Sequence, residues 1–194
     1  MGDSDSGYQL GTGIGEDEVA RLEAQGRAIA PATRMIFAEA GIRPGMRVLD
    51  LGCGAGDVAF VAADLVGPDG FVVGVDRSPD ALARARLRAG QRGLTQVQFV
   101  EGDINDPAPG GPFDAMVERL VLWLVPDPAA LLRRQATVLR PGGLVVPVEA
   151  DFSMMILVVN SGSMRRGRVR GAPGGWSAAG PAECRSSTLP AGAG

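Results

Sequence analysis

A buried strand that runs directly into a glycine loop is the feature that most constrains how this chain can fold. Residues 46–56 read MRVLDLGCGAG, an apolar stretch with an acid near its end and a glycine at every second position after it. In open α/β sheets, ligands bind where such a strand passes into the loop before the next helix. Glycine lets a ligand approach the backbone because no Cβ stands in the way. The segment therefore predicts a binding site.

The spacing of the glycines argues against a dinucleotide ligand. A dinucleotide fingerprint reads G-x-G-x-x-G and places pyrophosphate on the helix N-terminus. Here the third glycine, Gly56, comes one residue early, and Asp57 follows it. A carboxylate at that position repels a diphosphate. With Asp50 also acidic, the loop is expected to take a zwitterionic or cationic ligand.

Strands and helices alternate after this loop. Apolar strands are expected at 46–51, 71–76, 97–103, 113–121 and 142–151, with helices after Gly56, from Pro79 and from Pro128. Ser78 and Asp127 each precede one of these prolines, and an N-cap residue before proline is a typical helix start. Strands that are apolar almost throughout are typical of a parallel sheet covered on both faces. The sequence predicts an α/β fold with a doubly wound, mostly parallel sheet.

The remaining segments differ in composition, and 194 residues suit one domain. Residues 1–16 predict a flexible N-terminus, and 17–44 predict N-terminal cap helices with a break at Pro31. The α/β domain is expected over 45–160. Residues 161–194 are rich in Gly, Arg and Pro and predict a disordered tail.

Several chemistries are excluded by composition. The sequence contains no histidine and no lysine, so its 19 basic residues are all arginine. A histidine base, a Schiff-base lysine and a phosphate-loop lysine are therefore absent. Cys53 and Cys184 have neither a disulfide-framework nor a metal-ligand spacing, so no metal is expected. The net charge of −3 gives no basic surface for nucleic acid, and no run approaches the roughly 20 apolar residues of a membrane span. Together with the lack of a signal peptide, this predicts a cytoplasmic protein with a small-molecule partner.

Four motifs follow one another in a characteristic order: LDLGCGAG at 49–56, GVDRS at 74–78, EGDI at 101–104 and LRPGG at 139–143. In this order and spacing they resemble the class I S-adenosylmethionine-dependent methyltransferases, especially the small-molecule enzymes of the ubiquinone/menaquinone-biosynthesis type. The resemblance covers residues 45–151. It implies a Rossmann-like methyltransferase fold with S-adenosylmethionine as cofactor, whose amino and sulfonium groups are positive.

The resemblance also implies roles for individual residues. The loop after the first strand is expected at the methionine part of the cofactor, Asp76 at the ribose, and Asp103 with Ile104 at the adenine. The implied cofactor-binding residues are Asp50, Gly52, Cys53, Gly54, Gly56, Asp76, Arg77, Asp103, Ile104, Arg119 and Leu120. Simpler interpretations stand beside these. Asp57 is better explained as a cap of a turn or helix, and Cys53 as a small packed residue rather than a nucleophile. For Asp103 the ligand role is favoured, with a simple turn as the alternative.

The end of the predicted fourth strand is expected to face both cofactor and acceptor. Glu118 is the best-placed carboxylate if the reaction needs a base. An equally good interpretation makes Glu118 and Arg119 a solvated ion pair. Trp123 and Leu124 are expected in the core or in a pocket wall rather than as a platform for nucleic-acid bases.

The sequence thus predicts methyl transfer to a small-molecule acceptor by in-line displacement. The alternatives are a catalytically inactive cofactor-binding remnant and, more distantly, an NAD-dependent dehydrogenase. Members of the family add a helix and an antiparallel pair of strands after the fifth strand, whereas only residues 154–159 offer a strand here. The C-terminal strands are therefore expected to be incomplete, from truncation or an altered C-terminus. An unpaired sheet edge of this kind suggests a homodimer.

Overall fold

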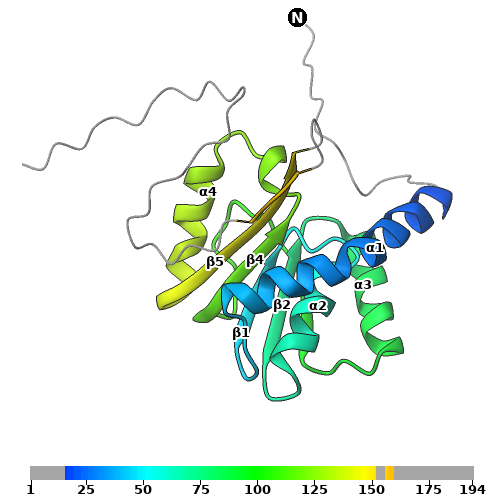
Figure 1. Cartoon of the computed structure of the whole chain (residues 1–194), viewed down its shortest axis with the longest axis horizontal. Coiled ribbons are helices and arrows are strands. Elements are labelled where there is room, and N and C mark those ends of the chain that lie inside the picture. The colour runs from blue at the N-terminus through cyan, green and yellow to red at the C-terminus, as the bar shows by residue number, and fades with distance from the viewer. Residues whose placement is uncertain (1–15, 152–155, 160–194) are drawn as a thin grey trace, which may run out of the picture.

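The structure is a computed structural model that describes residues 16–151 and 156–159. A twisted sheet lies at its centre, and helices cover both of its faces (Figure 1). This confirms the α/β, doubly wound fold predicted from the sequence. The expected flexible N-terminus before residue 16 and the expected tail at 161–194 lie outside the described residues.

Helices and strands alternate along the chain as predicted. In order they are α1 (Glu16–Ala40), β1 (Arg47–Leu51), α2 (Asp57–Val66), β2 (Phe71–Asp76), α3 (Pro79–Gln91), β3 (Val97–Glu101), β4 (Phe113–Arg119), α4 (Pro128–Gln135), β5 (Leu139–Asp151) and β6 (Ile156–Val159). Short 3-10 turns lie at Leu122–Leu124 and Ala136–Val138. The predicted helix caps are confirmed, because the Ser78 side chain accepts from the Ala81 N–H and the Asp127 side chain from the Ala130 N–H.

The fourth strand ends two residues earlier than the sequence predicts. The apolar run continues to Val121, but β4 stops at Arg119. The next residue, Leu120, has a φ of 62°, a left-handed conformation that cannot continue a strand. This turn redirects the chain at the end of β4.

The strand order in the sheet is β3-β2-β1-β4-β5-β6. Strands β1 to β5 pair in parallel, and β6 pairs antiparallel with β5. The chain moves outward from β1 to β3 and then returns to place β4 on the other side of β1. The order therefore reverses between β1 and β4, and α/β proteins bind ligands at the carboxyl ends of strands at such a switch point.

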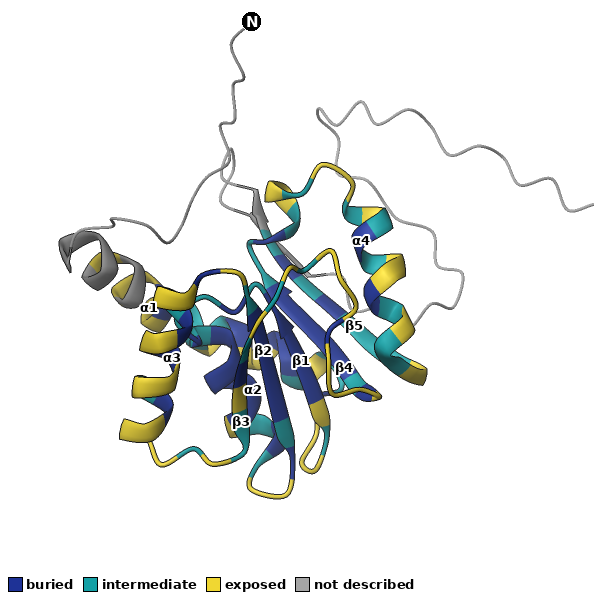
Figure 2. Cartoon of the chain, turned by 180° about the vertical axis from the view of Figure 1, so that it is seen from behind, coloured by how far each residue is buried: buried dark blue, intermediate teal, exposed yellow. Residues whose placement is uncertain are grey.

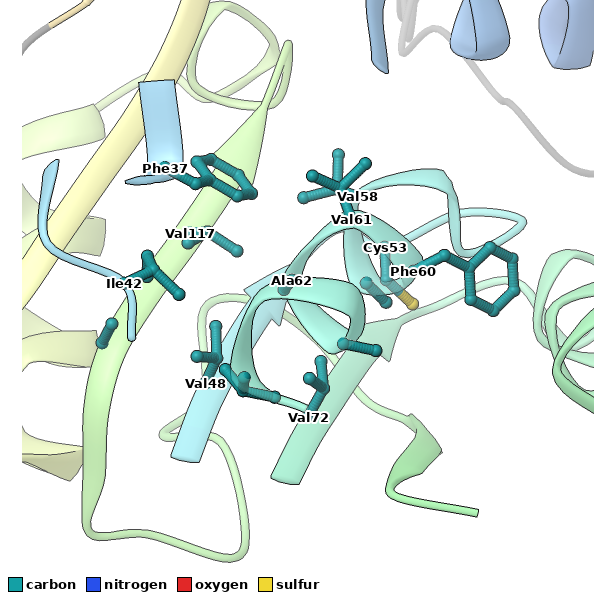
Figure 3. Close-up of a cluster of buried hydrophobic side chains, with 14 of the residues drawn as sticks. Phe37, Ile42, Val48, Cys53, Val58, Phe60, Val61, Ala62, Val72 and Val117 are labelled. Atoms are coloured by element: carbon teal, nitrogen blue, oxygen red, sulfur yellow. The ribbon is translucent and has the colours of Figure 1, made fainter. Parts of the chain in front are cut away.

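Alternate residues of the central strands pack on opposite faces of the sheet. Val48 and Val117 belong to a cluster that α1, α2 and α3 cover (Figure 3). Leu49 and Met116 belong to a second cluster, against which Leu132 of α4 packs. Figure 2 shows β1, β2 and β4 buried over most of their length. Burial on both faces explains why these strands read as nearly continuous apolar runs.

Helix α1 continues through Pro31, so the predicted break there is wrong. A proline inside a helix removes a backbone hydrogen bond and crowds the preceding turn, at a cost of roughly 3 kcal/mol. The following turns bury Ile36 and Phe37 in the core beside α2. The buried Thr33 hydroxyl also donates to the Ile29 carbonyl. Tertiary packing therefore outweighs the local cost of the proline.

We expect Pro31→Ala to stabilise the protein, because alanine restores the missing hydrogen bond of α1. Pro31 is exposed, so its loss removes little packing. The free energy of unfolding, measured by urea denaturation, should rise by about 1–3 kcal/mol. Pro128→Ala is the matched control and should bring no gain, since proline at the first position of α4 displaces no helical hydrogen bond. A less stable Pro31→Ala protein would contradict this account.

Candidate functional site

The predicted site residues come together at one edge of the sheet. Asp50 lies in β1, Asp76 ends β2 and Arg119 ends β4. The glycine loop at 52–56 connects β1 to α2. Because β2, β1 and β4 are parallel neighbours, the residues at their carboxyl ends share the switch point of the sheet.

Asp50 is buried without a hydrogen-bond donor. Its exposed fraction is 1%, and within the described chain neither carboxylate oxygen has a hydrogen-bond partner. Burial raises the pKa of Asp50 well above its usual value; the Arg119 charge opposes this, and the Asp76 charge adds to it. The Ala59 N–H also lowers the pKa but lies outside hydrogen-bonding geometry. An orphaned buried carboxylate is costly and is typical of a ligand site.

Each glycine of the loop is required for a different physical reason. A Cβ at Gly52 would lie 2.7 Å from the Val121 Cγ2 atom and its φ is 64°, so packing and backbone conformation explain that glycine without a ligand. A Cβ at Gly56 would lie 2.8 Å from the Phe60 ring. Gly54 has a φ of 51°, and a Cβ there would meet no described atom within 4 Å. The open space above Gly54 is where a ligand can approach the backbone.

Asp76 ties the glycine loop to the end of β2. Its Oδ2 atom accepts a hydrogen bond from the Gly54 N–H at 2.8 Å, and its Oδ1 atom accepts one from the Ser78 N–H at 2.9 Å. Each carboxylate oxygen has a second lone pair, so the group retains capacity for two further donors. Arg77, beside it, is exposed. Asp76 is therefore held rigidly with acceptor sites to spare.

Asp57 joins three helices. Its Oδ1 atom lies 2.6 Å from the Arg88 Nη2 atom in an ion pair between α2 and α3. Helix α1 passes close to the same carboxylate, because a Cβ at Gly26 would lie 2.7 Å from its Oδ2 atom. These contacts give Asp57 a structural role, but the predicted helix cap is wrong, because Gly56 is the N-cap of α2 and no side chain caps it. Arg88 and Gly26 carried no sequence signal, since their contacts depend on the folded arrangement of the helices.

Cys53 is part of the core beneath the loop. Figure 3 shows it among the buried side chains at the start of α2. Its backbone N–H donates to the Val75 carbonyl at 3.0 Å. Burial raises the pKa of the thiol, with the Asp50 charge adding to the shift, so the nucleophilic thiolate is disfavoured. This agrees with the expectation of a small packed residue.

The loop after β3 has an anchor that sequence reasoning missed. Asp103 is exposed, and its Oδ1 atom accepts from both the backbone and side-chain nitrogens of Asn105. The fully buried Gln135 of α4 donates to the carbonyls of Ile104 and Asp106 and accepts from the Ala108 N–H. One amide side chain thus fixes the expected adenine-binding segment. The only sequence signal was a polar residue on the buried side of a helix.

Glu118 is buried rather than solvated. Its exposed fraction is 1%, so the interpretation as a solvated ion pair with Arg119 is wrong. Its two oxygens accept hydrogen bonds from the Val121 and Val148 N–H groups at 3.0 and 3.1 Å. Arg119 instead donates to the Thr33 hydroxyl of α1 at 3.0 Å. Burial lowers the pKa of Arg119, which the carboxylates of Asp57 and Asp50 oppose.

Trp123 and Leu124 lie on the surface beyond β4. Their exposed fractions are 57% and 40%, so the expectation of a core position is wrong and that of a wall beside the site remains. The Trp123 indole N–H donates to the Leu120 carbonyl at 2.8 Å. The hydrogen bond fixes the ring to the turn that ends β4.

We expect Asp50→Asn to stabilise the protein without ligand. An acid whose pKa is raised by folding contributes stability below its unfolded pKa and loses it as the pH rises toward the folded value. The free-energy gain of Asp50→Asn over wild type should therefore increase between pH 5 and pH 7, by up to about 1.4 kcal/mol per pH unit. Urea denaturation at both pH values measures this. An equal gain at both would show that Asp50 does not take up a proton on folding.

Comparison with known proteins identifies the family. A family model described as a methyltransferase domain matches residues 42–162. The chain is 40% identical over 116 residues to a nocamycin O-methyltransferase of Saccharothrix syringae, and 43% identical over 111 residues to a 2-phytyl-1,4-naphtoquinone methyltransferase of Synechococcus elongatus. These regions cover 59% and 56% of this chain but 41% and 48% of the relatives. The chain thus spans less than half the length of these two relatives.

The fold has a counterpart among solved structures. It is similar to a crystal structure of a SAM-dependent methyltransferase from Aquifex aeolicus, with a TM-score of 0.62 and 22% identity, over 71% of this chain and 73% of that one. At this identity the likeness bears on the fold alone. The family match, in contrast, spans β1 to β6 and all the loops at the switch point. The chain therefore belongs to the methyltransferase domain family, as its motifs indicated when they resembled the class I S-adenosylmethionine-dependent enzymes.

Proposed function

We propose that this chain binds S-adenosylmethionine at the carboxyl ends of β1, β2 and β4 and directs methyl transfer to a small-molecule acceptor. The observation that carries the proposal is the orphaned carboxylate of Asp50, which is 1% exposed at the switch point of the sheet. Two further carboxylates, Asp76 and Asp57, raise the pKa of Asp50, and the positive charge of Arg119 lowers it. Such a site favours a ligand with positive groups and disfavours a diphosphate.

The residues present fit this cofactor. The Asp50 carboxylate suits a positive amino or sulfonium group, and the space above Gly54 admits a ligand to the loop. The spare acceptor sites of Asp76 suit two ribose hydroxyls. The residues proposed to hold the cofactor are Asp50, Gly52, Cys53, Gly54, Gly56, Asp76, Arg77, Asp103, Ile104, Arg119 and Leu120.

When bound, the cofactor supplies an electrophilic methyl group, and the nucleophile belongs to the acceptor. The chain's own contribution is to orient the two reactants and exclude water. Glu118 was the candidate base, but its oxygens are committed to backbone N–H groups. This geometry favours a positioning role for Glu118 over proton abstraction.

The acceptor is proposed from the relatives and from the mouth of the site. One relative is named as a naphthoquinone methyltransferase, in line with the ubiquinone/menaquinone-type resemblance. Exposed Trp123 and Leu124 offer an apolar surface beside the end of β4. We therefore favour a small organic acceptor with an apolar ring system. A cytoplasmic location and a homodimer through the sheet edge are further proposals; among the described helices, none has the length and apolar character of a membrane span.

Binding and turnover are tested separately. Calorimetric titration with S-adenosylmethionine, with NADH as the comparison ligand, tests the cofactor. Transfer of labelled methyl groups to a set of quinones and other small acceptors then tests activity. Binding without transfer would favour the inactive alternative, and binding of NADH instead would overturn the proposal.

We expect Asp76→Asn to weaken S-adenosylmethionine binding about 10- to 100-fold, since hydrogen bonds to a charged group contribute about 1.5–3 kcal/mol. Asp80→Asn is the matched control, because Asp80 is an exposed acid four residues away in the first turn of α3. The dissociation constant of S-adenosylmethionine for the Asp80→Asn protein should equal that for the wild type. Equal affinities for all three proteins would remove Asp76 from the cofactor site.

A further inference from the structure

A buried acid and a half-buried acid meet where β4 and β5 lie side by side. Glu118 of β4 accepts from the N–H of Val148, the residue before Glu149 of β5, and the Glu149 carboxyl group lies close enough for its charge to raise the pKa of Glu118. Two carboxylates that lie this close repel each other unless one of them carries a proton. Glu149 has no role in the site described above, and the pair is therefore a feature that the proposed cofactor site leaves unexplained.

The pair holds the segment that follows β4. The Glu118 oxygens accept from the Val121 and Val148 N–H groups, and the Glu149 Oε1 atom accepts from the Leu122 N–H at 2.7 Å. The Leu120 N–H donates to the Val148 carbonyl at 3.0 Å. Three successive residues of the segment are thus hydrogen-bonded to β5 or to the acid pair.

The same segment is strained and carries the apolar surface of the mouth. Leu120 has a φ of 62°, which is uncommon for a side chain of its size and must be held by its surroundings. Its carbonyl accepts from the Trp123 indole N–H. If the acid pair is lost, the turn at Leu120 has fewer bonds to maintain it, and Trp123 moves with it.

We propose that Glu149 is a positioning residue: with Glu118 it forms a proton-sharing pair that fixes the segment Leu120–Leu124 and so places Trp123 and Leu124 against the acceptor. This inference rests on the proposed function for its acceptor. The state of the segment itself is measurable without cofactor or acceptor.

Proton sharing makes the segment sensitive to alkaline pH. Burial, followed by the Glu149 charge, raises the pKa of Glu118 to about 9. Below that value the proton joins the two carboxyl groups; above it both are charged and repel each other. Stability from the pair is therefore lost as the pH rises through about 9. The neighbouring charge, Arg119, is directed to Thr33 and acts on Asp50 and Asp57.

Trp123 reports on the segment once the second tryptophan of the chain, Trp176, is replaced. In the full-length Trp176→Phe protein, the fluorescence anisotropy of Trp123 is followed from pH 6 to pH 10, while far-UV circular dichroism monitors the fold. We expect the anisotropy to fall with a midpoint near pH 9 as the segment is released. A flat profile over this range would overturn the proposal.

Three substitutions in the Trp176→Phe protein test which group causes the fall in anisotropy near pH 9. Glu149→Gln keeps an acceptor for Leu122 and a donor for Glu118, so the segment should stay ordered and the step near pH 9 should disappear. Glu118→Gln has one oxygen for two N–H groups and should show low anisotropy already at pH 7. Glu39→Gln, an exposed control on α1, should match the wild type. A step near pH 9 that survives in Glu149→Gln would assign it to another group.

Kinetics test the link to the acceptor. For any acceptor that is methylated, Glu118→Gln should raise the acceptor KM about tenfold, the scale of one lost hydrogen bond. The dissociation constant of S-adenosylmethionine should change by a smaller factor, because Leu120 is only one of the residues proposed to hold the cofactor. A weakened cofactor affinity with an unchanged KM would contradict the positioning role. Absence of any methylation would count against the proposed function, whereas the anisotropy profiles would still decide whether the pair controls the segment.

Discussion

The burial of the Asp50 carboxylate at the switch point of the sheet is the constraint around which the site is arranged. The positive charge of Arg119, which donates a hydrogen bond to Thr33 of α1, lowers the pKa of Asp50. The negative charges of Asp76 and Asp57 raise it. Asp57 is in turn paired with Arg88 of α3. The charged residues that act on Asp50 are thus tied to α1 through Thr33 and to α3 through Arg88. Such an arrangement lowers the stability of the ligand-free protein, a cost that the proposed positive ligand would offset.

Sequence patterns predicted the parts of this structure that depend on residues close to one another in the sequence. The strands followed from apolar runs, two helix starts from a cap residue before proline, and the ligand loop from its glycines and acids. The continuity of α1 through Pro31 did not follow, because it depends on packing of Ile36 and Phe37 against α2. No sequence pattern indicated the hydrogen-bond partners of the site residues either. Thr33 and Arg119 are 86 positions apart, and Gln135 lies 29 positions from Asp106, whose carbonyl it binds.

The described residues account for more of the proposed cofactor site than of the proposed acceptor site. The residues around Asp50 and Asp76 come from β1, β2, β4 and the helices beside them, all within the family match. The mouth beyond β4 is formed by a short segment with two exposed apolar side chains. The relatives are more than twice as long as the regions they share with this chain. A fold of this kind hosts many activities, so the acceptor must be argued from the mouth residues and not from the fold.

Asp50 and Glu118 show that burial alone does not identify a ligand-binding acid. Both are 1% exposed near the ends of adjacent strands, and burial raises the pKa of both. Their hydrogen bonds separate them. Glu118 accepts from two backbone N–H groups, so its oxygens are used within the protein. Neither oxygen of Asp50 has such a partner in the described chain. A buried acid with satisfied oxygens stabilises a local conformation, whereas one without donors retains its full capacity to bind a positive group.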